Sequence, residues 1–336
     1  MVARLTHWDA GASLPDAARA VQWAHDLDQL VRQGDAGVAA MAEFLSTGSN
    51  SDFGSWGRTN VGFSTPRVAF FDALAKIGTP SAVALLGATL QTTLEPAEIG
   101  TALRGLDALV PGQYAEVALD AARQALAVAG RGALPERDLA PAFEILQKYG
   151  GAEAAPELEK LSEKYVYYST MALAALPDNA GLSVLAAMAK GEGERSFAVR
   201  LAAQQMLALL APAQPEAREA LLTAVCSNVI APSGWKFVGM ALEGKRFAYE
   251  NGVLDPPPAG TAPAPSYRAH ILSGNQHYVQ TTDPAAANPA WRERQLALLD
   301  QMLAVAKSED GVAQLRSLRL ALLAPQTKAE VLPAGR

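Results

Sequence analysis

Apolar residues recur at three- and four-residue steps through most of the chain, which is the spacing of helices that bury one face. Ser13 is a candidate cap for the first run, where Ala17, Val21, Ala24 and Leu27 follow one another at this spacing. Beyond residue 66 the runs become regular, and joints rich in Gly, Pro or Asp separate them. The pattern predicts helices over 14–33, 36–45, 66–77, 81–92, 96–110, 114–129, 138–149, 152–163, 166–176, 181–190, 196–210, 215–229, 233–242, 290–307 and 310–323.

Several of these runs begin with a polar capping residue followed by proline, as in Thr65-Pro66, Thr79-Pro80 and Asn288-Pro289. A cap satisfies a free backbone N–H, and proline at the first helical position sacrifices no hydrogen bond. Helices joined by such short connections pack antiparallel with their neighbours. The chain is therefore predicted to be all-α.

Two stretches of the chain share internal similarity. Arg67 precedes Leu74 by seven positions, and Arg200 precedes Leu207 by the same interval, so each pair lies two turns apart on one helix face. In both stretches the next helix opens with proline and carries a Leu-Leu pair near its middle. This repetition predicts a repeated two-helix unit.

The repeated units at 66–92 and 196–229 resemble the short bacterial HEAT-like repeats, a type also found in phycobilisome lyases. The resemblance implies a right-handed α-solenoid of antiparallel helical hairpins. It also implies that Arg67 and Arg200 brace neighbouring hairpins through a carboxylate or helix-end carbonyls. Arrays of this kind commonly serve as binding surfaces.

Two segments depart from the helical pattern. Residues 46–66 are rich in Gly, Ser and Asn and are predicted to form a long loop. Its Phe53, Trp56 and Phe63 either pin the loop to the helices or contact a partner. The second segment, 255–265, is rich in proline, which disfavours helix and predicts a linker or a strap across the surface.

A small β-hairpin is expected after the proline-rich segment. Residues 267–272 and 277–281 alternate apolar and polar positions on either side of Gly274-Asn275. The predicted organisation is then an N-terminal helical cap with a Gly/Ser-rich loop, a HEAT-like array, a Pro-rich insertion with the hairpin, and C-terminal capping helices. These parts cover 1–65, 66–243, 244–289 and 290–336, respectively.

Composition supports a helical array rather than one compact core. The 336 residues exceed the size at which single cores usually stop growing, whereas stacked repeats escape that limit. Half of the residues are hydrophobic but only 7% are aromatic, so Ala and Leu supply the apolar surface. The net charge of −6 argues against nucleic acid as the main partner.

The chain has no apolar run long enough to cross a membrane, so no membrane insertion is expected. Its first residues lack the basic start and apolar centre of a signal peptide. A cytoplasmic location is the expectation. The alternative is a periplasmic or secreted protein, if Met1 is an artificial start placed after a removed leader.

Candidate chemistry is sparse. None of the four histidines lies in a zinc-helix spacing, although His270 and His277 could meet across the hairpin with Asp283 or Glu250 as a third ligand. Ordinary polar packing is the favoured reading of both histidines, and no metal or cofactor is predicted. The single cysteine, Cys226, follows an apolar run and is expected to be buried.

A Ser-x-x-Lys spacing at Ser233 and Lys236 lacks the accompanying elements of penicillin-recognising enzymes. We therefore predict a non-catalytic interaction scaffold that presents a concave helical-repeat surface to a protein or peptide. The alternative is a small-molecule-binding protein or enzyme with a site between the 255–283 insertion and the array. The candidate partner-binding residues are Phe53, Trp56, Arg58, Tyr165, Tyr167, Tyr168, Trp235, His270, His277 and Tyr278.

Overall fold

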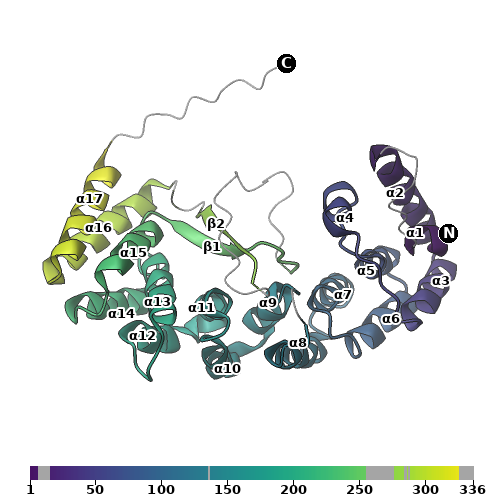
Figure 1. Ribbon diagram of the computed structural model, residues 1–336, viewed down its shortest axis with the longest axis horizontal. Coiled ribbons are helices and arrows are strands. Elements are labelled where there is room, and N and C mark those ends of the chain that lie inside the picture. Colours follow the sequence, from purple (N-terminus) through teal and green to yellow (C-terminus); the bar gives the residue numbers. More distant parts are fainter. Residues whose placement is uncertain (7–15, 135–136, 255–275, 284–285, 287, 325–336) are drawn as a thin grey trace, which may run out of the picture. The chain divides into compact units, whose positions relative to one another are not determined.

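The computed structural model describes residues 1–6, 16–134, 137–254, 276–283, 286 and 288–324 (Figure 1). These residues are predominantly helical, which confirms the all-α prediction, with one small two-stranded sheet. The chain forms two compact units. Of the described residues, those within 1–150 together with 250–254 and 276–277 form the N-terminal unit, and the others form the C-terminal unit. The division at Gly150 falls inside the segment that the sequence assigns to one array.

The N-terminal unit is built from two layers of helices. Its helices are α1 (Val2–Thr6), α2 (Asp16–Arg32), α3 (Asp35–Ser46), α4 (Gly54–Asn60), α5 (Pro66–Ile77), α6 (Pro80–Leu90), α7 (Pro96–Leu109), α8 (Ala115–Gly130) and α9 (Ala140–Tyr149). One layer packs α2, α5, α7 and α9 in succession, and the other packs α3, α6 and α8. Each helix also packs against the next along the chain from α5 to α9.

The C-terminal unit repeats this two-layer arrangement. Its α-helices are α10 (Ala154–Leu161), α11 (Val166–Ala175), α12 (Leu182–Lys190), α13 (Phe197–Leu210), α14 (Pro215–Cys226), α15 (Trp235–Leu242), α16 (Pro289–Val305) and α17 (Glu309–Leu323). Single 3₁₀ turns, η1 (Gly151–Glu153), η2 (Pro177–Asn179) and η3 (Pro232–Gly234), lie at three joints. The layers are α11, α13, α15 and α17, and α10, α12, α14 and α16.

The expected capping residues start the helices as predicted. Thr65 and Thr79 each accept a hydrogen bond from a backbone N–H of the first turn, and proline follows each of them. Asn288 accepts such a bond from Ala290 at the start of α16. These local interactions explain why most predicted helices are found close to their expected bounds.

The first predicted helix buries a different face from the one expected. Of the expected face, Leu27 is buried but Val21 is 72% exposed, and Trp23 and Leu30 are buried in its place. Trp23 is decisive here, because its indole N–H donates to the carbonyl of Leu5 and its ring packs edge-on against Phe53. Periodicity alone did not distinguish these overlapping faces.

The segment 46–66 is not wholly a loop, because α4 forms inside it. Phe53 is buried against Trp23, and Phe63 also contacts Trp23 with ring centroids 5.9 Å apart. The segment is therefore fastened to α2 by its aromatic side chains, which agrees with the pinning interpretation.

The strand partner also differs from the expectation. Strand β2 (Tyr278–Thr282) coincides with the second half of the expected hairpin, but it pairs antiparallel with β1 (Lys245–Tyr249). The register places Lys245 opposite Thr282 and Tyr249 opposite Tyr278. The expected first strand, 267–272, lies outside the described residues.

Candidate functional site

A buried ion pair holds three elements of the N-terminal unit together. Arg67, at the start of α5, donates to both carboxylate oxygens of Glu98 in α7, at 2.7 and 3.1 Å. Its Nη1 also donates to the carbonyl of Leu45 in α3, at 3.0 Å. Thr93 and Asn50 donate to the same carboxylate, at 2.8 and 3.4 Å. The expected bracing role of Arg67 is thus confirmed.

The parallel expectation for Arg200 is wrong. Within the described part of the chain, its buried Nε has no hydrogen-bond partner. Its aliphatic stem instead lies against the helix end at Gly191, where an added Cβ would be 2.8 Å from Arg200 Cδ. The side-chain carbons of Arg200 therefore pack against the backbone at Gly191.

A short segment of turn and bend conformation, 250–254, lies on α7 and α9 of the N-terminal unit; we call it the strap. Glu144, near the middle of α9, accepts hydrogen bonds through Oε2 from the backbone N–H groups of Val253 and Leu254, at 2.6 and 3.2 Å. Glu144 is only 6% exposed. A buried carboxylate requires such donors, because losing them would leave its charge without compensation.

Further contacts fix the strap along its length. Arg104 Nη1 donates to the Val253 carbonyl at 3.4 Å, while its Nη2 approaches Asp72 at 3.3 Å. Asn251 donates through Nδ2 to Asp138 at 2.7 Å. Gly100 lies beneath the strap, and a Cβ there would lie 2.8 Å from the Pro141 Cβ and 3.2 Å from the Val253 Cβ, so the missing side chain lets both α9 and the strap approach α7. Backbone groups thus supply most of the strap's polar contacts.

An aromatic cluster occupies the C-terminal unit, where the β1–β2 ribbon meets α11. The rings of Tyr167, Phe247 and Tyr278 contact one another with centroids 4.6 to 5.2 Å apart. Tyr168 packs edge-on against Tyr249, at 5.0 Å. Burial raises the pKa of both the Tyr167 and Tyr278 hydroxyls above the ordinary tyrosine value, so both remain neutral phenols at physiological pH.

This cluster unites three of the candidate residues, but as packing. Tyr168 is fully buried and Tyr278 is 5% exposed, while Tyr167 is partly exposed. Rings this close leave no space between them for a ligand. Their contribution is to anchor the ribbon to α11.

Other aromatic candidates also proved to be core residues. Tyr165 is fully buried, and Phe53 and Trp235 are each 3% exposed, so these side chains stabilise the fold and are not surface contacts. Trp56 is partly exposed, with the Arg19 guanidinium 5.6 Å from its ring. Arg58, on α4, is exposed and is available to a partner.

The two histidine candidates do not form a site together. His277 is partly exposed, and its Nδ1 lies 3.9 Å from Glu250. His270 lies outside the described residues. Among the residues that the structure describes, no three His, Cys, Asp or Glu side chains gather closely enough to hold a metal ion.

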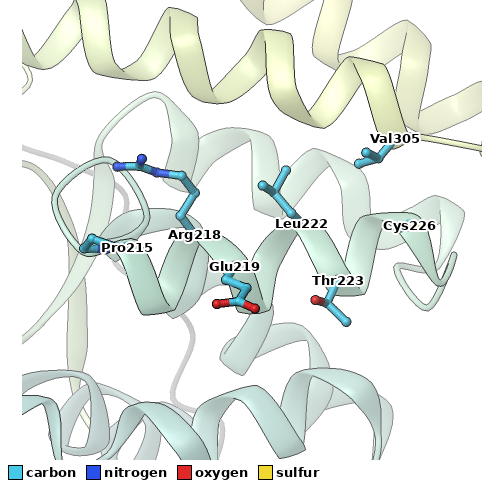
Figure 2. Close-up of a pocket in the computed structure, with 7 residues that line it drawn as sticks. All are labelled: Pro215, Arg218, Glu219, Leu222, Thr223, Cys226 and Val305. Atoms are coloured by element: carbon cyan, nitrogen blue, oxygen red, sulfur yellow. The ribbon is translucent and has the colours of Figure 1, made fainter.

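A surface groove of about 360 Å³ follows α14 in the C-terminal unit (Figure 2). It is lined by Pro215, Arg218, Glu219, Leu222, Thr223, Cys226 and Val305. Cys226 is exposed, which corrects the expectation of burial. Leu221, Ala224 and Val225 are buried on the core face of α14. Cys226, the last residue of that helix, lies outside this face.

None of the helices in the described part of the chain combines the length and apolar character needed to span a bilayer. Comparison with known proteins adds no relative: no family model, no curated protein and no solved structure matches the chain.

Sequence reasoning missed Glu144, Arg104 and Glu98. A signal was present for two of them, because Glu144 and Glu98 interrupt apolar positions on otherwise buried helix faces. A charge in such a position requires a partner, which marks it for attention. Nothing in the local sequence indicates that the partner of Glu144 is a backbone more than a hundred positions away.

Proposed function

We propose that this chain is a non-catalytic scaffold, a right-handed α-solenoid of HEAT-like helical hairpins that binds a protein or peptide partner. The observation that carries the proposal is the two-layer packing found in each unit. Within each layer, successive helices pack against one another. Helices stacked in this way expose a continuous face of many side chains along each layer. Such a face suits an extended or helical partner.

The irregular segments support the same function. The 46–66 segment is fastened to α2 through Trp23, and the β1–β2 ribbon is fastened to α11 through the aromatic cluster. The anchoring aromatic side chains are buried or partly buried, whereas Arg58 on α4 and Arg246 on β1 are exposed. Segments that are anchored to the helices and expose a charged side chain are suited to selecting a partner.

Site-specific photo-crosslinking in cells of the native host tests this proposal. A photoreactive side chain is introduced at Arg58 or Arg246, and at Asp120 on α8 as the matched control. Asp120 is exposed, but α8 packs in the layer of α3 and α6, whereas α4 packs against α2 and β1 packs against α11. The proposal expects one protein to be crosslinked reproducibly from Arg58 or Arg246 and not from Asp120. Absence of any protein crosslink, or equal crosslinking from Asp120, would contradict it.

A further inference from the structure

The strap makes contacts of the kind by which a helical surface would hold a separate peptide in a turn conformation. Two consecutive N–H groups converge on Glu144 Oε2, and the carbonyl between them accepts from Arg104. Asn251 adds a side-chain hydrogen bond from the strap to Asp138, just before α9. Recognition through the backbone does not depend on which side chains the bound segment carries.

We infer that the surface formed by Gly100 and Arg104 of α7, Glu144 of α9 and Asp138, which precedes α9, is a binding site for a short peptide with a turn-like backbone, which the strap occupies in cis. This inference rests on the proposed scaffold function and assigns it a location and a ligand class. The ligand is a segment with two consecutive free N–H groups, a small or β-branched residue over Gly100, and an apolar residue after it. Proline is excluded at the two donor positions, because it has no N–H.

The charges at the site favour this ligand. Glu144 and Asp138 are acceptors, and Arg104 is held in place by Asp72 while it donates to the strap carbonyl. An arriving backbone thus meets acceptors for its N–H groups and a donor for its C=O group. Leu254 is 8% exposed, so the site also covers one apolar side chain.

The strap and a partner would compete for the same groups. A tethered segment acts at an effective concentration in the millimolar range, so a free peptide binds weakly while the strap is seated. Release of the strap exposes the Glu144 carboxylate, which then gains a ligand of the same kind. The strap would therefore regulate access to the site.

A substitution can release the strap without changing the site. Val253→Pro removes the N–H that forms the 2.6 Å bond to Glu144, and leaves Gly100, Arg104 and Glu144 intact. The probe is a fluorescein-labelled peptide with the sequence of residues 249–254, Tyr-Glu-Asn-Gly-Val-Leu, followed by fluorescence anisotropy. We expect it to bind the Val253→Pro protein about tenfold more tightly than the unsubstituted protein, as expected for one charge-assisted hydrogen bond.

Two controls identify the contact. A probe methylated on the valine and leucine nitrogens cannot donate and should bind about tenfold more weakly. Glu144→Gln, added to Val253→Pro, should weaken the unmodified probe by a similar factor, whereas Glu116→Gln on the exposed surface of α8 should not. Equal binding of the methylated probe, or no binding to the Val253→Pro protein, would overturn the inference.

Amide hydrogen exchange of the unsubstituted protein gives a second measurement, which does not depend on the variant folding. The inference requires the Val253 and Leu254 amides to exchange through local opening, at lower protection than the amide of Leu103 in α7. Exchange only through global unfolding would show a permanent strap and would overturn it. If the peptide site fails while crosslinks from Arg58 or Arg246 persist, the scaffold function stands and only this location is wrong.

Discussion

The Arg67–Glu98 pair shows how single residues join helices that lie apart in sequence. Both side chains are largely buried, with 12% and 3% of their side-chain surfaces exposed, and the arginine also donates to the Leu45 carbonyl near the end of α3. Three helices and the 46–66 segment therefore depend on one carboxylate, because Asn50 contacts it too. Removing one partner leaves a buried charge without compensation.

We expect Arg67→Ala to lower the free energy of unfolding by about 3–5 kcal/mol, because Glu98 loses its countercharge. Denaturant unfolding measures this change. Arg32→Ala is the matched control, since Arg32 forms an exposed ion pair with Asp28 one turn away and should cost less than about 1 kcal/mol. Equal losses for the two variants would show that the Arg67 pair is not a brace.

Glu95 lies beside this network, and its ionisation should make the free energy of unfolding depend on pH. Burial raises the pKa of Glu95 above its ordinary value, and the nearby Arg137 only partly offsets the effect. The folded state therefore binds the proton more tightly, so the free energy of unfolding falls as pH rises from the unfolded to the folded pKa. Glu95→Gln should stabilise the protein at neutral pH, and thermal unfolding across a pH series should show the gain shrinking at acidic pH.

The β1–β2 ribbon is held in place by its contacts with α11. A two-stranded ribbon is marginal in water on its own, so its order depends on the aromatic cluster that anchors it to α11. The Phe247 ring contacts the rings of Tyr167 in α11 and Tyr278 in β2. It therefore links the sheet to the helix layer.

We expect Phe247→Ala to loosen the ribbon, because both ring contacts disappear. Hydrogen exchange should become at least about tenfold faster at the Ala248 and Val279 amides, since a loss of roughly 1.4 kcal/mol of local stability corresponds to that factor. Amides of α13 should be unchanged. Arg246→Ala, on the opposite face of β1, serves as the control, and a similar acceleration there would contradict the anchoring role.

Close packing of α15 against α17 depends on a missing side chain. A Cβ at Gly311 would lie 2.5 Å from the Trp235 ring, whereas a Cβ at Gly130 would meet nothing within 4 Å. Gly311→Ala should therefore lower the free energy of unfolding by about 1–3 kcal/mol. Gly130→Ala should be neutral or slightly stabilising, which denaturant melts of the two variants can check.

At the scale of the molecule, contacts within each unit run mainly between helices that are one or two positions apart in the chain. Each of the two units has its own fully buried leucines, such as Leu103 and Leu207. Stability in such a structure is largely a sum of neighbouring interactions. Unfolding should then proceed in more than one step.

We expect Leu103→Ala and Leu207→Ala each to cost about 2–5 kcal/mol, but in different transitions. Urea unfolding followed by hydrogen exchange should show the loss of protection confined first to the unit that carries the substitution. A single transition shifted equally by both variants would show that the two units unfold as one.

The sequence alone was sufficient for most of the helical structure. Thr65, Thr79 and Asn288 cap the predicted helices because caps and prolines act on the backbone within one turn. The Arg67 brace was also predictable, through its resemblance to a repeat. These features depend on contacts close in sequence or on a repeated pattern.

Tertiary structure alone decided which surfaces meet. The partner of β2 is β1, Cys226 is exposed, and Glu144 holds the strap, and none of these follows from local spacing. Each depends on segments that approach only after the helices have stacked, as the Glu144–Val253 contact does across 109 positions. Helix formation is local, whereas the candidate site is assembled by long-range packing, and for that reason the sequence indicated its framework but not its residues.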